Sequence, residues 1–208
     1  MALRRTVILA AGDFPKKGSA ARKALDEAAR VVCCDGAADA YRRRTGKEPS
    51  AVVGDCDSVK GRFRNVVLVP DQDSNDLEKA AKYCSRRGWK NPLVVGAFGK
   101  REDHSIGNVF RALDLGLEIL GDHGRFVPVE GKAVFRVAKG TGVSVFATDP
   151  RTNATSKGLE WKLDGVKFAN VYCATLNRAA ASKVEISADR RILVYIPANG
   201  NNERCGGI

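Results

Sequence analysis

Short apolar runs that end in acidic or glycine-rich turns recur along the first half of the chain. Residues 31–34 lead into Asp35, residues 51–53 lead towards Asp55, and residues 93–95 lead into a loop with several glycines. Longer helical patterns separate these runs, an alternation typical of a mostly parallel sheet covered by helices. Ligands of open α/β sheets bind outside the carboxyl ends of the strands, so we expect these turns to converge on one site.

The first half, residues 1–122, is therefore predicted to form an α/β domain with a mostly parallel, Rossmann-like sheet. The expected strands cover residues 6–10, 31–34, 51–53, 65–69 and 93–95, and the expected helices cover residues 19–29, 37–44, 75–87 and 105–115.

The second half, residues 123–208, has a different pattern. Its apolar segments are short, rich in β-forming residues and separated by Gly, Pro, Asn and Asp, and no helix of normal length fits between them. The expected strands cover residues 126–129, 133–137, 143–147, 158–163, 184–187 and 192–196. We predict a small all-β sandwich domain.

The formal net charge of +11 leaves open a basic module that binds nucleic acid, most of all around residues 42–44. The basic residues are, however, spread along the chain and interleaved with acids, and no ladder of aromatic and basic residues accompanies them. We interpret most of the charge as solvated surface, with a minority steering an anionic substrate. A nucleic-acid partner is therefore not expected.

The cysteines and the apolar runs indicate the compartment. The six cysteines include no CxxC pair, and Cys33 and Cys34 lie in an apolar run, so we expect reduced thiols and a cytoplasmic protein. The start of the chain, residues 1–11, resembles a signal peptide but is too short and is broken at Gly12. No stretch approaches the roughly 20 apolar residues of a membrane span, so no membrane partner is expected.

The segment of residues 70–80 concentrates carboxylates next to a lysine. Asp71, Asp73 and Asp76 lie within six residues of one another, and Lys79 follows on the first turn of the expected helix. Such carboxylates repel one another unless a cation lies among them, and Mg²⁺ binds through a few carboxylates together with substrate phosphates. The alternative is a solvated acidic loop with a good helix start.

These loops, in this order and followed by a β domain, resemble the thiamine pyrophosphokinase family. Residues 35–39 are similar to the family's DGGAN, residues 54–58 match GDxDS in full, and residues 71–80 are similar to DQDxTDFxKA. Residues 96–104 carry most of GxxGGRxDH, and Asn108 follows one helical turn later. The resemblance implies transfer of a pyrophosphoryl group from ATP to the thiamine hydroxyl, which yields thiamine diphosphate and AMP. It also implies that residues 1–122 form the catalytic domain that binds ATP and metal, and that residues 123–208 form the thiamine-binding domain.

The resemblance departs from the family in two places. Lys100 stands where a second glycine is usual, and the family's STSN turn survives only as residues 174–177, ATLN. Residues 155–161 are similar to (S/T)xGLxW, so Trp161 is expected to stack on thiamine, with a core aromatic as the alternative. The lost serines leave open another pyrophosphokinase whose acceptor is, for example, a hydroxymethyl pterin.

The resemblance and the chemistry of phosphoryl transfer together imply a set of site residues. The expected catalytic residues are Asp55, Asp73, Asp76, Lys79, Arg101 and Asp103. One or two Mg²⁺ ions are expected on Asp55, Asp57, Asp71, Asp73, Asp76 and Asp103. Further contacts to ATP are expected from Asp35, Gly36, Gly54, Asp57, Gly99, Arg101, His104 and Asn108, and contacts to thiamine from Ser156, Trp161, Thr175 and Asn177.

Two alternatives and one assembly state accompany these assignments. Lys79 and Arg101 are expected to neutralise phosphate charge, with a surface salt bridge to a neighbouring aspartate as the alternative for each. His104 is expected either to contact nucleotide or substrate, or merely to cap a helix. In the family the thiamine site lies between two subunits, so the resemblance implies a homodimer.

Overall fold

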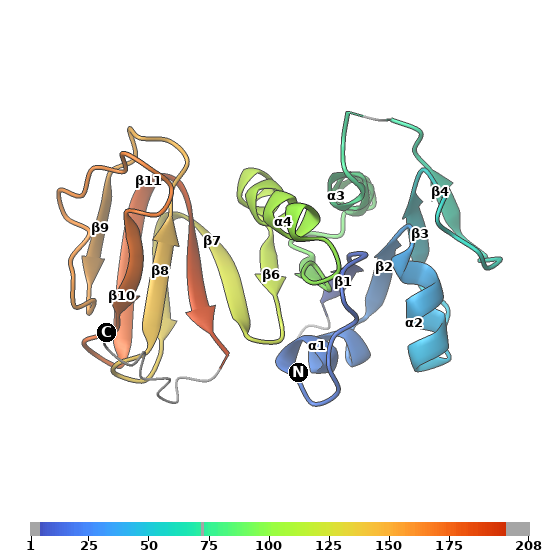
Figure 1. The fold of residues 1–208 in the computed structure, drawn as a ribbon, viewed down its shortest axis with the longest axis horizontal. Helices are drawn as coiled ribbons and strands as arrows, with labels where there is room; N and C mark the ends of the chain where they lie inside the picture. The colour runs from blue at the N-terminus through green and yellow to red at the C-terminus, as the bar shows by residue number, and fades with distance from the viewer. Residues whose placement is uncertain (1–4, 72, 199–208) are drawn as a thin grey trace. The chain divides into compact units, whose positions relative to one another are not determined.

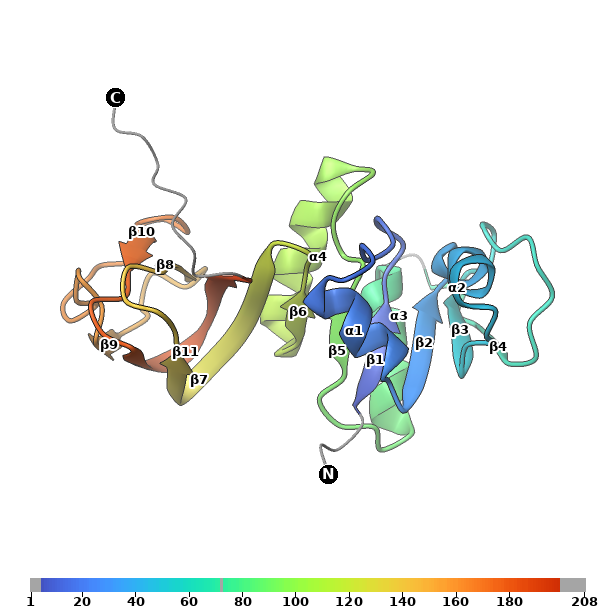
Figure 2. The same cartoon turned by 90° about the horizontal axis from the view of Figure 1, so that it is seen from below.

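The computed structural model describes residues 5–71 and 73–198, and the chain divides into two compact units. The N-terminal unit spans Met1–Asp122 and the C-terminal unit spans His123–Ile208 (Figure 1 and Figure 2). The first residues of the signal-like start, Gln72 of the acidic segment and the sixth cysteine, Cys205, lie outside the described residues.

The N-terminal unit contains a parallel sheet with the strand order β6-β5-β1-β2-β3-β4 (Figure 1). Its strands are β1 (Thr6–Leu9), β2 (Arg30–Cys34), β3 (Ala51–Gly54), β4 (Val66–Leu68), β5 (Leu93–Val95) and β6 (Glu118–Leu120). β1, β3 and β5 are buried along their whole length, as expected of strands covered on both faces. The prediction of an α/β unit is confirmed, and β6 is a strand that we did not predict.

Helices cover both faces of this sheet (Figure 1). They are α1 (Ala20–Asp26), α2 (Ala37–Thr45), α3 (Asp76–Arg86) and α4 (Glu102–Leu115). α1 and α2 share a buried cluster with Val7, Val31 and Val52, whereas α3 contacts β1, β2 and β3. Neighbouring residues of a strand point to opposite faces, so the continuous apolar runs supply both layers.

The helix ends differ from the predicted ones for local reasons. Asn75 caps α3, since its Oδ1 accepts a hydrogen bond from the backbone N–H of Glu78 at 3.0 Å. α4 begins at Glu102, three residues earlier than predicted, and its N-cap Arg101 makes no side-chain cap bond. Asp103 and His104 are therefore helical residues, and the alternative that His104 caps a helix is wrong.

The C-terminal unit is antiparallel, and its described residues contain no helix. Its strands are β7 (Gly124–Arg136), β8 (Gly142–Phe146), β9 (Ala154–Lys157), β10 (Ala174–Arg178) and β11 (Lys183–Pro197), in the order β10-β8-β11-β7 with β9 also on β11. Hydrogen bonds join β7, β8 and β9 to β11, and β10 to β8. The five strands thus belong to one hydrogen-bonded sheet, and a sandwich would require this sheet to fold over on itself. The sandwich therefore stays a prediction.

Of our strand predictions in this unit, the one at residues 158–163 is wrong, and four others are parts of two longer strands. Residues 126–129 and 133–137 belong to the single strand β7, and residues 184–187 and 192–196 belong to β11, whose pairing shifts register between Ala188 and Ile192. Residues 158–163 form a loop. β9 and β10 were not predicted.

The loop at residues 158–163 explains why its sequence resembles a strand. Gly158 has φ +80°, and a Cβ at this position would lie 2.2 Å from the carbonyl oxygen of Lys183, so the chain turns there. Leu159 and Leu163 are buried in the core of the unit, while Trp161 between them is exposed. The alternating pattern therefore arises from a loop with two apolar anchors.

Candidate active site

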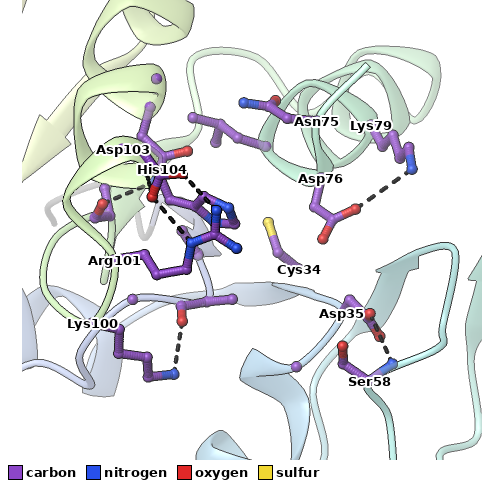
Figure 3. A pocket seen from close by; sticks show the side chains of 18 of the residues that line it. Cys34, Asp35, Ser58, Asn75, Asp76, Lys79, Lys100, Arg101, Asp103 and His104 are labelled. Atoms are coloured by element: carbon purple, nitrogen blue, oxygen red, sulfur yellow. Dashed lines mark hydrogen bonds and ion pairs between the residues drawn. The ribbon is translucent and has the colours of Figure 1, made fainter. Parts of the chain in front are cut away.

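A cavity of about 640 Å³ lies in the N-terminal unit, at the carboxyl ends of β1, β2, β3 and β5 and the starts of α3 and α4 (Figure 3). The expected convergence of the strand-end turns is therefore found. The charged and amide side chains that line it are Asp35, Asp55, Asn75, Asp76, Lys79, Lys100, Arg101, Asp103, His104 and Asn108.

Asp35 is the most buried carboxylate of the cavity. Only 3% of the residue is exposed, and its Oδ2 accepts a hydrogen bond from the backbone N–H of Ser58 at 3.2 Å. Its Oδ1 is buried and has no hydrogen-bond partner among the described residues. Buried oxygens are almost always paired, so this atom is available to a ligand.

Asp55 and Asp57 follow β3 and lie close to Asp35. One carboxylate oxygen of each of the three residues lies within 4.8 Å of the others. This donor set contains only hard oxygen ligands, which fits Mg²⁺, and Asp35 also carries the unpartnered Oδ1. Cys56, between the two loop aspartates, has φ 63°, a left-handed conformation that shapes this tight turn.

The charge state of Asp35 reflects this crowding. Burial raises the pKa of Asp35 to about 6, an effect opposed by the backbone hydrogen bond from Ser58 and reinforced by Asp57, Asp76 and Asp55. The pKa of Asp57 is lowered, chiefly by its hydrogen bond from the Ser58 hydroxyl. A cation among these carboxylates would replace the proton that Asp35 otherwise takes up below about pH 6.

Gly54 makes this clustering possible because it has no side chain. A Cβ on Gly54 would lie 2.8 Å from the Cβ of Asp35 and 3.3 Å from Oδ1 of Asp76. We expected Gly54 to let the backbone approach phosphate. In this structure the residue instead lets two carboxylates approach each other, and it does not line the cavity itself.

Asp76 and Lys79 form an ion pair on the first turn of α3. Nζ of Lys79 lies 3.6 Å from Oδ1 of Asp76, and the two side chains are 3% and 34% exposed (Figure 3). The alternative of a surface salt bridge is therefore wrong for Lys79, because the ion pair exists but the lysine is buried. Asp76 is the first residue of α3. Burial raises the pKa of Asp76, and the charge of Lys79 opposes that shift.

Arg101 and Asp103 form a second ion pair at the start of α4. Nε and Nη2 of Arg101 donate to the two carboxylate oxygens of Asp103 at 3.1 and 2.6 Å, and both residues are exposed. The guanidinium lowers the pKa of Asp103 to about 2. A phosphate in the cavity would have to share Arg101 with this carboxylate. The fork geometry that holds Asp103 suits a phosphate equally well.

Asp71 and Asp73 do not line the cavity, although Ser74 next to them does. Asp71 accepts hydrogen bonds from the Ser74 hydroxyl and from the backbone N–H of Asp73, and both aspartates are exposed. These are the bonds of a local turn. The structure therefore leaves these two predicted ligands apart from the group formed by Asp35, Asp55 and Asp57.

Some lining residues were missed by the sequence reasoning. The segment of residues 10–12 follows β1 and lines the cavity, as do Cys34 and Gly107 elsewhere. A signal for residues 10–12 existed, since they too follow an apolar run and lead into a glycine and an aspartate. No such signal marked Cys34, because its place in an apolar run indicates only a small hydrophobic residue of a strand.

In the C-terminal unit, Trp161 is 55% exposed. The alternative of a core aromatic is therefore wrong. Asn177, which is 4% exposed, holds the backbone of Trp161: its Oδ1 accepts from the Trp161 N–H at 3.2 Å, and its Nδ2 donates to the Trp161 carbonyl at 2.6 Å. Asn177 thus positions the loop that presents the tryptophan.

Ser156 and Thr175 are also engaged within the unit. Ser156 is 5% exposed, and its Oγ accepts from the backbone N–H of Leu163 at 3.0 Å. The Thr175 hydroxyl donates to the carbonyl oxygen of Tyr172 at 2.8 Å. Both hydroxyls therefore fix turns on either side of Trp161, rather than pointing unpaired into solvent.

Comparisons with known proteins match both units. Residues 21–118 match the family "Thiamin pyrophosphokinase, catalytic domain", and residues 124–195 match "Thiamin pyrophosphokinase, substrate-binding domain". Thiamine pyrophosphokinase 1 of Oryza sativa subsp. japonica is 24% identical, over 81% of this chain and 78% of that protein.

Solved structures have the same fold. Thiamin pyrophosphokinase from Geobacillus thermodenitrificans has a TM-score of 0.70 at 20% identity, covering 96% of this chain and 99% of that one. A thiamin pyrophosphokinase family protein from Enterococcus faecalis has a TM-score of 0.72 at 14% identity, covering 94% and 99%. With both of its units matched along most of their length, the chain belongs to the thiamin pyrophosphokinase family.

Proposed function

We propose that this chain transfers a pyrophosphoryl group from ATP to the hydroxyl of thiamine, giving thiamine diphosphate and AMP. The observation that carries the proposal is the cavity of about 640 Å³, which is lined by the carboxylates of Asp35, Asp55, Asp76 and Asp103 and by Lys79 and Arg101. Its volume falls in the range of small-molecule sites. The family match makes the pterin and nucleic-acid alternatives unnecessary.

Mg²⁺ is part of the proposal. Asp35, Asp55 and Asp57 would hold it, since one oxygen of each lies in the cluster and Asp35 carries an unpartnered Oδ1. When bound, the ion neutralises charge on the phosphate oxygens of ATP. Asp71, Asp73, Asp76 and Asp103 remain proposed ligands that act through water or after exchange of their present partners.

The residues of the chain itself bind and orient the triphosphate. Phosphoryl transfer needs the attacking hydroxyl and the leaving oxygen in line, and positioning with charge neutralisation supplies most of the catalysis. Lys79 is a compact point charge fixed by burial, and Arg101 offers a bidentate contact. Asn108 donates from Nδ2 to the carbonyl oxygen of Ala97 at 2.9 Å and so braces the loop after β5 next to the cavity.

Recognition of thiamine is assigned to the C-terminal unit. The exposed ring of Trp161 can stack on the thiazolium, and cation–π attraction adds about 1 kcal/mol. Ser156 and Asn177 act through the loop that they hold, and Thr175 acts through its turn. In this proposal they are positioning residues.

Assembly and location complete the proposal. We propose a homodimer, as the family resemblance implies, and a cytoplasmic enzyme, with which the free thiols of the described cysteines agree. None of the helices in the described part of the chain has the length and hydropathy needed to span a membrane. Light scattering coupled to size exclusion would give the subunit number.

Product analysis tests the reaction. The protein is incubated with ATP, Mg²⁺ and thiamine, and the nucleotides and thiamine esters are separated by chromatography. The proposal predicts AMP and thiamine diphosphate in equal amounts. Formation of ADP with thiamine monophosphate would instead show a simple kinase, and no thiamine ester at all would remove thiamine as the acceptor.

A further inference from the structure

Lys100 lines the cavity from the loop between β5 and α4, at a backbone conformation that glycine would adopt more easily. Its φ is 57°, next to Gly99 with φ +83°. A side chain in this left-handed region costs free energy, and residues held there often serve function. The lysine at this position therefore points to a function of its side chain.

The ammonium of Lys100 is the least committed cation of the cavity. Lys79 pairs with Asp76 and Arg101 with Asp103, whereas Lys100 has no carboxylate partner among the described residues. Its Nζ donates one hydrogen bond, 2.7 Å long, to the carbonyl oxygen of Ala11 (Figure 3). An ammonium has three donors, so the group can accept further ligands.

The bond to Ala11 is not needed to hold the two neighbouring loops together. Backbone hydrogen bonds already join them, from Ala10 to Val95 at 2.9 Å, from Gly12 to Gly96 at 2.9 Å and from Asp13 to the carbonyl of Phe98 at 2.6 Å. The side-chain bond thus holds the ammonium beside the cavity, and it is not the sole link between the loops.

We propose that Lys100 binds the polyphosphate of ATP as a third cation of this cavity and so sets the affinity for the nucleotide. The inference rests on the proposed function, in which the cavity holds ATP. Charge decides between the two substrates: thiamine carries a cationic ring that an ammonium repels, whereas the triphosphate is a polyanion. Lys100 therefore acts on ATP binding and not on thiamine binding.

Two variants separate the charge from the backbone. Lys100→Asn removes the charge but keeps a residue that tolerates the left-handed conformation, and Lys100→Arg keeps the charge. Lys90→Asn is the matched control, since Lys90 is exposed in the same unit and does not line the cavity. The KM values for ATP and thiamine, kcat and the thermal midpoint are measured for each at two salt concentrations.

Lys100→Asn should raise the KM for ATP about tenfold, with kcat and the KM for thiamine within about twofold of wild type. The KM for ATP should also depend less on salt, and the thermal midpoint should stay within about 2 °C. Lys100→Arg and Lys90→Asn should resemble wild type. An unchanged KM for ATP in Lys100→Asn, an equal loss in Lys100→Arg, or an effect on thiamine alone would overturn the inference.

Calorimetry with MgATP keeps the two proposals distinguishable. A wild-type protein that binds ATP but forms no AMP would contradict the proposed reaction, while the inference on Lys100 would still be decided by the affinities. Lys100→Asn should then bind ATP about tenfold more weakly than wild type. Equal affinities of Lys100→Asn and wild type would refute the role of Lys100 whatever the reaction is.

Discussion

The two units place their candidate residues in opposite environments. In the N-terminal unit, Asp55 directly follows strand β3, Arg101 and His104 lie at the start of α4, and all three line a cavity. In the C-terminal unit, Ser156 and Asn177 are buried and bonded to main-chain atoms. Polar residues at the carboxyl edge of a parallel sheet thus point to chemistry, whereas polar residues within a β unit can serve to shape a loop.

Asp76→Asn is expected to give the largest effect because Asp76 serves both the site and the fold. We expect turnover to fall at least about a hundredfold, as charge compensation in the cavity is lost. The variant should also lose about 2 kcal/mol of stability, since the buried Lys79 loses its partner, although Asp76 is itself one-third exposed. Turnover and thermal midpoint are measured together.

The double variant Asp76→Asn with Lys79→Met separates these two roles. Removing both charges should restore most of the thermal midpoint, because a methionine can be buried without a partner. Turnover should stay low. If turnover recovered along with stability, the ion pair would have only a structural role. The polar residues of the N-terminal cavity would then not differ in role from those of the C-terminal unit.

Gly54→Ala should disturb the carboxylate cluster without altering any charge. The new methyl group would come within 2.8 Å of the Cβ of Asp35, so this carboxylate must shift. We expect a loss of about 1–3 kcal/mol in stability and a roughly tenfold fall in turnover. Gly142→Ala in the C-terminal unit is the control, because nothing lies within 4 Å of its Cβ position. Full activity in Gly54→Ala would show that the positions of these carboxylates are not critical.

Trp161→Ala tests the C-terminal unit. The KM for thiamine should rise at least about tenfold while the KM for ATP stays constant, because the ring would contact only the acceptor. The thermal midpoint should change little, since Trp161 is 55% exposed. A large fall in midpoint with an unchanged KM for thiamine would contradict this role.

Asn177→Ala provides the companion test, with a smaller expected effect on binding. It leaves the backbone of Trp161 without two hydrogen bonds in a buried setting, so stability should fall by about 1–3 kcal/mol. The KM for thiamine should rise less than in Trp161→Ala, because the ring itself remains. An effect on binding without any loss of stability would indicate direct contact between Asn177 and thiamine.

The sequence predicted the N-terminal unit well because its signals are local. Continuous apolar runs fix the strands, and the residues that follow them lie at one edge of the sheet by geometry alone. Asp35 and Asp55 converge for that reason. The unpartnered oxygen of Asp35 and the burial of Lys79 could not be predicted, since both depend on packing between loops far apart in the sequence.

The C-terminal unit was harder to predict for a physical reason. Alternation of apolar and polar residues is shared by a strand and by a loop with two apolar anchors, such as Leu159 and Leu163 around Trp161. The register shift in β11 likewise left a polar interval that resembled the end of a strand. Long-range pairing, which the local pattern does not contain, decides both cases.

Binding of ATP with and without divalent metal tests the central claim most directly. The carboxylates of the cavity repel a polyphosphate unless a cation lies between them. Calorimetry of the wild-type protein should therefore show ATP binding at least about tenfold more tightly in Mg²⁺ than in EDTA. Equal affinity in the two conditions would contradict the account of this cavity as a site for ATP and metal.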